Sequence, residues 1–254
     1  MKKRIRSILL LCCMVLTMLP TTVLAADGPM DTIPKYDVSI DVYNRTSDIS
    51  IKDSRSYYIY SSVPDKLRDT WAWDKKIFIK GDKTAPHVFI DGVNIEMSPS
   101  SKGPAIELNK KASAYIYFIG KNSSLQGADG RAAIQKNRSE GQLYVLARTG
   151  TTVTCKGGYR AAGIGGSWAI RNIGDPMFNM DMYGHGVNMH FGSQSNPDYW
   201  GGTINATGGE YGAGIGAGSW GHSGYSGNAI HGGAGERLYF YSGTVNASGG
   251  RLAA

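Results

Sequence analysis

The sequence predicts an all-β protein whose short strands stack as the coils of a parallel β-helix. Three observations lead to this fold class. Glycine is frequent, at 35 of 254 residues, and is concentrated in the second half of the chain. A unit of fourteen residues recurs there, and short segments rich in β-branched and aromatic residues alternate with turn residues. Strands this short cannot bury an apolar face alone, so successive coils must stack to form a core.

The repeat is the strongest of these signals. Residues 152–165 align without gaps with residues 203–216, and both copies carry a Gly-Gly pair followed by Ala-Gly-Ile-Gly. A third copy, 244–254, stops just before its Gly-Ile-Gly, so we expect a truncated last repeat and an intact protein that continues into further coils. The pair Gly157 and Gly158 is predicted to lie where the coil turns through positive φ, a conformation that strains other residues.

Apolar residues at the same place in each coil are predicted to stack as ladders. Ile106, Ile134 and Ile164 lie 28 and 30 residues apart, within the 20 to 45 residues of one solenoid repeat. Ile215 follows after 51 residues, which predicts an insertion at about 169–200. Two further predicted ladders are Val153 with Ile204 and Val245, and Cys155 with Ala206 and Ala247. Cys155 is therefore expected to be a buried, inert thiol.

The remaining segments read as short strands between turns. We expect residues 26–85 to form N-terminal strands and a cap, and residues 86–254 to form the β-helix repeats. Trp71 and Trp73 are expected to help cover the N-terminal end, because an open first coil would present unpaired strand edges. The segments predicted as strands are 48–51, 57–60, 77–80, 88–90, 115–119 and 143–146.

The first 25 residues have the layout of a signal peptide. Four cations within residues 2–6 precede an apolar run over 8–19 that is too short to span a bilayer. We expect cleavage after Ala25 and a protein that is secreted or lies on the bacterial cell surface, with no transmembrane segment in the mature chain. A lipoprotein modified at Cys12 or Cys13 is disfavoured, because leucines stand where small residues are needed.

Charge and cysteine content narrow the function classes further. Removal of the signal peptide lowers the formal charge from +7 to +3, because its four cations have no acidic residue beside them. A charge this small, with acidic residues spread along the chain, argues against nucleic acid as a partner and leaves a weak preference for acidic glycans open. Cys155 is the one cysteine of the three outside the signal peptide, so no internal disulfide is expected and packing must stabilise the fold.

The Gly-Gly and Ala-Gly-Ile-Gly units occur together with upstream strand-like runs at 87–95, 105–108, 115–122 and 132–135. In this combination the chain resembles a family of Gram-positive bacterial surface proteins. The resemblance spans about residues 37–254 and implies a right-handed parallel β-helix. Some members are described as carbohydrate-binding domains, often within larger cell-surface chains. The segment from 170 to 198, rich in Met, Asn and His, departs from the family pattern.

Candidate carbohydrate contacts are aromatic residues that recur with the repeat. Trp168 and Trp220 each follow a serine shortly after Gly-Ile-Gly, and Tyr159 and Tyr211 lie in the turn after the Gly-Gly pair. In stacked coils such rings would line up on one side, and flat apolar faces suit sugar rings. The alternative is that each ring only covers the coil below it. The favoured partner is a polysaccharide or a host or matrix glycan, including a cell-wall polymer.

A catalytic hypothesis rests on polar residues in the insertion, namely Asp175, Asp181, His185, His190 and Asp198. A polysaccharide lyase or hydrolase would need paired carboxylates, or a calcium cluster with a basic residue. The spacing of these residues matches neither a helical zinc pair nor a known triad, so no catalytic residue is assigned. A binding role is favoured over an enzyme, and a structural stalk of a larger adhesin is the third hypothesis.

The glycine-rich loops carry no recognisable cofactor motif. There is no Walker Lys-Ser pair, and no Gly-x-Gly-x-x-Gly that follows a strand and opens a helix. Residues 232–237 begin like a calcium-binding nonapeptide, but Arg237 stands where the aspartate ligand belongs and the run does not recur. The sequence therefore predicts no cofactor and no metal site, and calcium stays an open alternative that no motif indicates.

Overall fold

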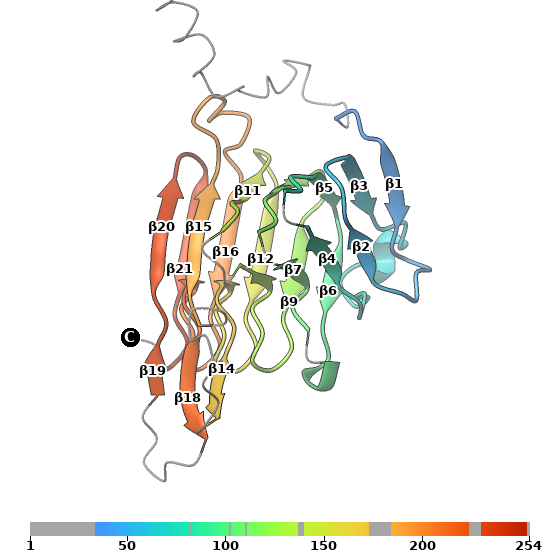
Figure 1. The fold of residues 1–254 in the computed structure, drawn as a ribbon. Coiled ribbons are helices and arrows are strands. Elements are labelled where there is room, and N and C mark those ends of the chain that lie inside the picture. Colours follow the sequence, from blue (N-terminus) through green and yellow to red (C-terminus); the bar gives the residue numbers. More distant parts are fainter. Residues whose placement is uncertain are drawn as a thin grey trace, which may run out of the picture. The chain divides into compact units, whose positions relative to one another are not determined.

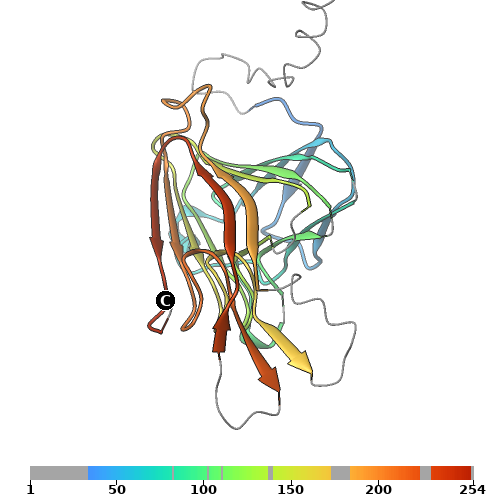
Figure 2. The same ribbon diagram turned by 60° about the vertical axis from the view of Figure 1, so that its left-hand side comes forward.

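The computed structural model describes residues 34–81, 83–101, 103–109, 111–136, 140–172, 184–223 and 230–252. Over these residues the chain winds through three parallel sheets, and its strands visit the sheets in a repeating order (Figure 1). The predicted all-β parallel β-helix is therefore confirmed. The hydrophobic core lies between the three sheets, which surround a common interior (Figure 2).

Each of the three sheets, named A, B and C here, takes one strand from a complete coil. Sheet A contains β1 (Val38–Asp41), β3 (Ser56–Tyr60), β5 (His87–Asp91), β8 (Ala114–Ile119), β11 (Leu143–Ala147), β15 (Gly186–Phe191) and β20 (Gly235–Phe240). Sheet B contains β2 (Ile49–Ile51), β4 (Ile77–Lys80), β7 (Ile106–Asn109), β10 (Ile134–Gln135), β13 (Ile164–Gly165) and β17 (Ile215–Gly216). Sheet C contains β6 (Asn94–Glu96), β9 (Ser123–Gln126), β12 (Thr152–Lys156), β16 (Thr203–Thr207) and β21 (Thr244–Ser248).

A single ladder of isoleucines runs through sheet B. Each member is the first residue of its strand, and each pairs in parallel register with the next. The predicted stacking of Ile106, Ile134, Ile164 and Ile215 is confirmed, and the ladder extends two coils further toward the N-terminus, to Ile77 and Ile49. All but Ile215 are almost fully buried, so this column is the centre of the core.

The two predicted ladders in sheet C are also confirmed. Val153 pairs with Ile204, which pairs with Val245. Cys155 pairs in the same way with Ala206, and its thiol is fully buried in the core. Burial raises the pKa of the Cys155 thiol, so the group stays protonated and does not act as a nucleophile at neutral pH.

The N-terminal strands β1 to β4 belong to the same sheets as the strands that follow residue 86. Trp73 pairs through a parallel bridge with Ile95 and is almost fully buried, and its indole Nε1 donates a hydrogen bond to the carbonyl oxygen of Arg45 at 2.8 Å. Trp71 packs against the core and meets the ring of Tyr43 edge to face. Trp73 thus fills the position that β6 occupies one coil later.

Residues beyond the basic coil lie in two places between Ile164 and Ile215. Between sheets B and A the chain makes β14 (Ala169–Asn172), and residues 173–183 lie outside the described part. Within the predicted insertion, β15 is a regular strand of sheet A, and a longer connection over 192–202 follows it. In the next coil, β18 (Ser219–Ser223) and β19 (Ile230–Gly232) join β14 in a small fourth sheet beside the solenoid (Figure 2).

The Gly-Gly pairs serve close approach between backbones, and the prediction that Gly157 and Gly158 adopt positive φ is wrong. A Cβ on Gly158 would lie 1.9 Å from the carbonyl oxygen of Ala128 in the preceding coil. One coil later, a Cβ on Gly209 would lie 1.9 Å from the carbonyl oxygen of Gly158. Positive φ occurs instead at the last glycine of Gly-Ile-Gly, for example at Gly165, where φ is 129°.

Because backbone fills the space beside Gly209, we expect Gly209→Ala to lower the free energy of unfolding by about 1–3 kcal/mol. Gly209→Asn should be no better, since tolerance of positive φ does not remove the clash. At Gly150, with φ of 83° and open space around it, asparagine should be tolerated better than alanine. Chemical denaturation of the four variants measures this. Recovery of stability by Gly209→Asn would contradict the close-approach explanation.

Candidate functional site

Three of the four aromatic candidates meet around one cation, Arg160. Its guanidinium carbon lies 5.0 Å from the ring centre of Tyr159, 5.2 Å from that of Trp168 and 5.3 Å from that of Tyr211. The two tyrosine rings meet edge to face, with their centres 6.0 Å apart. The cluster therefore joins two successive coils, and its cation covers ring faces that a sugar would otherwise contact.

Trp168 also packs against the coil that precedes it. Its backbone N–H donates to the carbonyl oxygen of Gly130 at 2.9 Å, and a Cβ on Gly130 would lie 3.1 Å from the indole ring. Arg160 Nε and Trp168 Nε1 are buried and have no hydrogen-bond partner in the described part of the structure, so cation–π attraction holds the guanidinium here. This packing is what the alternative interpretation of Trp168, as a cover for the coil below, requires.

Trp220 does not share the register of Trp168. In the pairing of β14 with β18, Trp220 lies beside Ala169, one residue after Trp168. The side chain of Trp220 is outside the described part of the structure, so its role in glycan contact stays a prediction.

The polar residues of the insertion are not gathered into a described catalytic centre. Asp175 and Asp181 lie outside the described residues. His185 accepts a hydrogen bond at Nδ1 from the backbone N–H of Ala234, and Asp198 is exposed in the connection after β15. His190 is buried in sheet A. Among the described residues, no group of three or more His, Cys, Asp or Glu side chains is placed to hold a metal ion.

His190 belongs to a column of stacked rings on the outward face of sheet A. Neighbouring ring centres lie 4.3–4.7 Å apart, with interplanar angles of 5–16°. Because each ring covers the face of the next, the column offers ring edges rather than ring faces to solvent. In order along the sheet, the members of this aromatic column are His87, Tyr115, Tyr144, His190 and Tyr239.

Both histidines of the aromatic column also hydrogen-bond to a tyrosine of the next coil. In each case this tyrosine lies two residues after the ring on which the histidine stacks, Tyr115 or Tyr239. The Nδ1 atom of His87 lies 2.9 Å from the hydroxyl oxygen of Tyr117, and that of His190 lies 3.0 Å from the hydroxyl oxygen of Tyr241. Burial lowers the pKa of both histidines below the ordinary value, so the neutral ring is favoured in the folded state. Burial also raises the pKa of Tyr144 to about 12.

The outward face of sheet C has a different chemistry, and two of its rows consist of hydroxyl and amide groups in register. One row consists of Thr152, Thr203 and Thr244. The next row consists of Asn94, Ser124, Thr154, Asn205 and Asn246. Alternate residues of the same strands, such as Leu125 and Val153, point into the core. We call this surface the polar face of sheet C.

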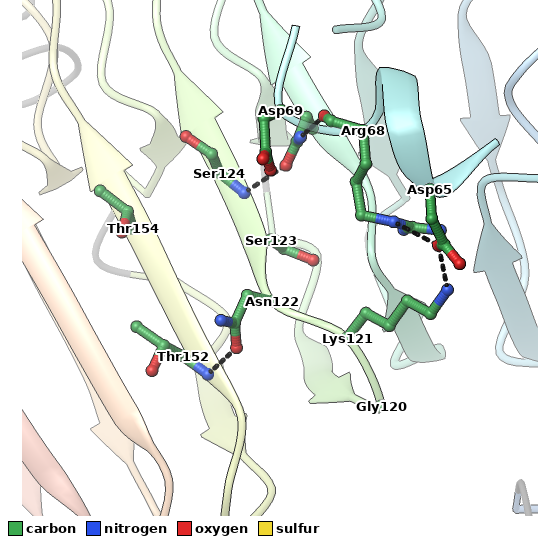
Figure 3. A pocket seen from close by; sticks show the side chains of 11 residues that line it. Asp65, Arg68, Asp69, Gly120, Lys121, Asn122, Ser123, Ser124, Thr152 and Thr154 are labelled. Carbon is green, nitrogen blue, oxygen red and sulfur yellow. Dashed lines mark hydrogen bonds and ion pairs between the residues drawn. The ribbon is translucent and has the colours of Figure 1, made fainter. Parts of the chain in front are cut away.

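A pocket of about 660 Å³ lies at the N-terminal end of the polar face (Figure 3). Strands β6, β9 and β12 supply its floor, and the segment that contains η1 (Asp65–Leu67) supplies one wall. Charged groups stand on the wall and in the turn before β9, and uncharged polar groups lie on the floor. The lining residues that carry polar side chains are Asp65, Arg68, Asp69, Asn94, Lys121, Asn122, Ser123, Ser124, Thr152 and Thr154.

Sequence reasoning missed the polar face and the pocket for different reasons. The polar face is visible in the repeat, because Thr203 and Asn205 have counterparts in Thr244 and Asn246, but only the apolar residues between them were predicted to form ladders. The pocket depends on η1, which belongs to no repeat and whose Asp65 meets Lys121, 56 residues later in the chain. No pattern in the sequence marks that contact.

No protein-family model matches the chain, and no match is found among curated proteins or among solved structures. Within the described residues, no helix is both long enough and apolar enough to cross a membrane. The function must therefore be judged from the geometry of the aromatic column on sheet A and the polar face of sheet C.

Acidification from pH 7 to pH 5 should lower the free energy of unfolding. The pKa of His87 and of His190 is lower in the folded state than the unfolded value of about 6.5. Their contribution is therefore complete above that value and is lost as the pH falls through the folded-state pKa. The double variant His87→Phe with His190→Phe keeps the stacked rings, and its stability should fall less over this range. Equal slopes of stability against pH in the unchanged protein and the double variant would refute the assignment of this loss to His87 and His190.

Proposed function

We propose that this protein is exported to the bacterial surface and binds polysaccharide there through the polar face of sheet C. The observation that carries the proposal is the register of that face, in which hydroxyl and amide groups recur on successive coils. Strands in a parallel sheet lie about 4.8 Å apart, so the face offers hydrogen-bonding groups at a constant interval. A polysaccharide presents its own hydroxyl groups at a constant interval along its chain.

The polar face is well prepared for such a ligand. Threonine has a stiff χ1, so Thr154 and Thr203 lose little freedom when a ligand binds. Asn246 Nδ2 donates to Asn205 Oδ1 at 2.8 Å, which fixes the orientation of both amides along the row. The exposed residues Ser124 and Thr154 make no side-chain hydrogen bond to a described residue, which leaves their hydroxyl groups available.

Two features of the sequence support the same proposal. The signal-peptide layout of residues 1–25 agrees with export. The resemblance to Gram-positive surface proteins with Gly-Gly and Ala-Gly-Ile-Gly units agrees with a carbohydrate ligand and with right-handed coils. Trp168, Trp220, Tyr159 and Tyr211 remain predicted contacts, although Arg160 already covers three of these rings.

Loss of two hydroxyl groups from the polar face should weaken polysaccharide binding. Thr154→Val with Thr203→Val keeps side-chain shape and removes two hydrogen-bonding groups, so we expect about tenfold weaker retention or more on immobilised polysaccharides. Ser39→Ala with Ser50→Ala, at exposed positions in sheets A and B, is the matched control and should bind like the unchanged mature chain. Absence of retention on every polysaccharide tested would reject binding by this segment and favour the structural stalk.

The predicted aromatic contacts can be tested on the same polysaccharides. If the polar face is the binding surface, Trp168→Ala with Trp220→Ala should change retention by less than about threefold, provided that circular dichroism shows a folded chain. Loss of retention in this variant, with normal retention in the threonine variant, would move the site to the aromatic residues.

A further inference from the structure

One wall of the pocket in Figure 3 is the segment that contains η1, and Arg68 hydrogen-bonds this segment to the solenoid. The Arg68 guanidinium donates to the carbonyl oxygen of Gly92 at 3.2 Å and to that of Val63 at 3.5 Å. Asn94 Nδ2 donates to the carbonyl oxygen of Arg68 at 3.0 Å. These bonds tie the η1 segment to the turn before β6, so the pocket is a formed feature of the fold.

The cations of the pocket are already paired. Lys121 Nζ lies 2.7 Å from Asp65 Oδ1, and an Arg68 nitrogen lies 3.3 Å from the same oxygen (Figure 3). Both cations therefore share one carboxylate. A second carboxylate, Asp69, also lines the pocket and has no ion pair or hydrogen bond to a described residue. The formal charges of Asp65, Asp69, Arg68 and Lys121 sum to zero, and the carboxylate of Asp69 is the one without a partner among the described residues.

The floor of the pocket offers free hydroxyl and amide groups. Asn122 Oδ1 accepts the backbone N–H of Thr152 at 2.8 Å, which leaves the Asn122 amide N–H groups available as donors. Asn94 Oδ1 accepts the backbone N–H of Ser124 at 3.0 Å. The side-chain hydroxyls of Ser124 and Thr154 have no partner among the described residues (Figure 3).

We infer that the pocket holds an uncharged sugar unit, whose hydroxyl groups donate to the Asp69 carboxylate and bond the floor at Asn122, Ser124 and Thr154. This inference rests on the proposed polysaccharide function and names the class of polymer, which is neutral. The Asp69 carboxylate can accept two hydroxyl donors from one sugar ring, and such charge-assisted bonds are the strong ones. The remaining units of the polymer continue along the polar face of sheet C.

An acidic sugar fits the same pocket poorly. A uronate or sulfate group would approach unpaired Asp69, and like charges repel. Lys121 and Arg68 already share the carboxylate of Asp65, whose charge offsets part of theirs, so they attract a further anion less than two unpaired cations would. Those two cations hold the pKa of Asp65 below its ordinary value, so Asp65 stays charged and keeps its partners.

The test compares neutral and acidic oligosaccharides on the mature chain by isothermal titration. We expect cellohexaose or chitohexaose to bind with little dependence on salt, and hexagalacturonate to bind at least about tenfold more weakly. Asp69→Asn keeps the size of the side chain and removes its charge, so binding of the neutral hexasaccharides should weaken by about tenfold. Glu236→Gln, an exposed carboxylate in β20, is the matched control and should bind normally.

The outcomes separate this inference from the proposed function. Equal or tighter binding of hexagalacturonate, or full binding by Asp69→Asn, would overturn the inference. If the threonine variant of the polar face still loses retention in that case, the proposed function stands. If no glycan binds the unchanged mature chain, the proposed function fails first and the inference fails with it.

Discussion

The stacking of one isoleucine on the next in sheet B is the constraint on which the other features depend. Because Ile49, Ile77, Ile106, Ile134, Ile164 and Ile215 share one register, every coil is held at the same interval above the previous one. The outward residues of sheets A and C inherit this interval and must also form columns. One inward contact thus produces an aromatic column on sheet A and a polar face on sheet C.

The two outward surfaces use the same geometry in opposite ways. On sheet A, rings such as Tyr144 and His190 stack face to face, so these ring faces are not accessible to a ligand. On sheet C, small hydroxyl and amide groups cannot cover one another, so residues such as Ser124 and Thr154 keep unused hydrogen-bonding capacity. The proposed recognition surface therefore lies where the side chains are short and polar, whereas the sequence favoured the aromatic residues.

The period of 28 to 30 residues was sufficient to predict the fold, because only a residue that stacks on its own copy must recur at that spacing. The ladder of Ile164 was found for this reason, and the ladder of Val153 was found because residues 152–165 align without gaps with residues 203–216. The role of Gly158 was not, since a glycine required by a neighbouring backbone and a glycine required by positive φ look alike in a sequence. The pocket was hidden more deeply, because its wall comes from the nonrepeating segment that Arg68 anchors, and periodicity carries no information about such a segment.

The contact at the Gly-Gly pairs has a direction. Gly158 is required by the carbonyl of Ala128 before it, Gly209 by that of Gly158, and Gly250 by that of Gly209. Each coil thus carries a glycine that admits the carbonyl group of its predecessor, and its own carbonyl group requires a glycine at the same place in its successor. A gene segment that encodes one coil can be duplicated in tandem, because the copy already fits the surface that its parent presents. The array can lengthen by whole coils without compensating mutations at the junction.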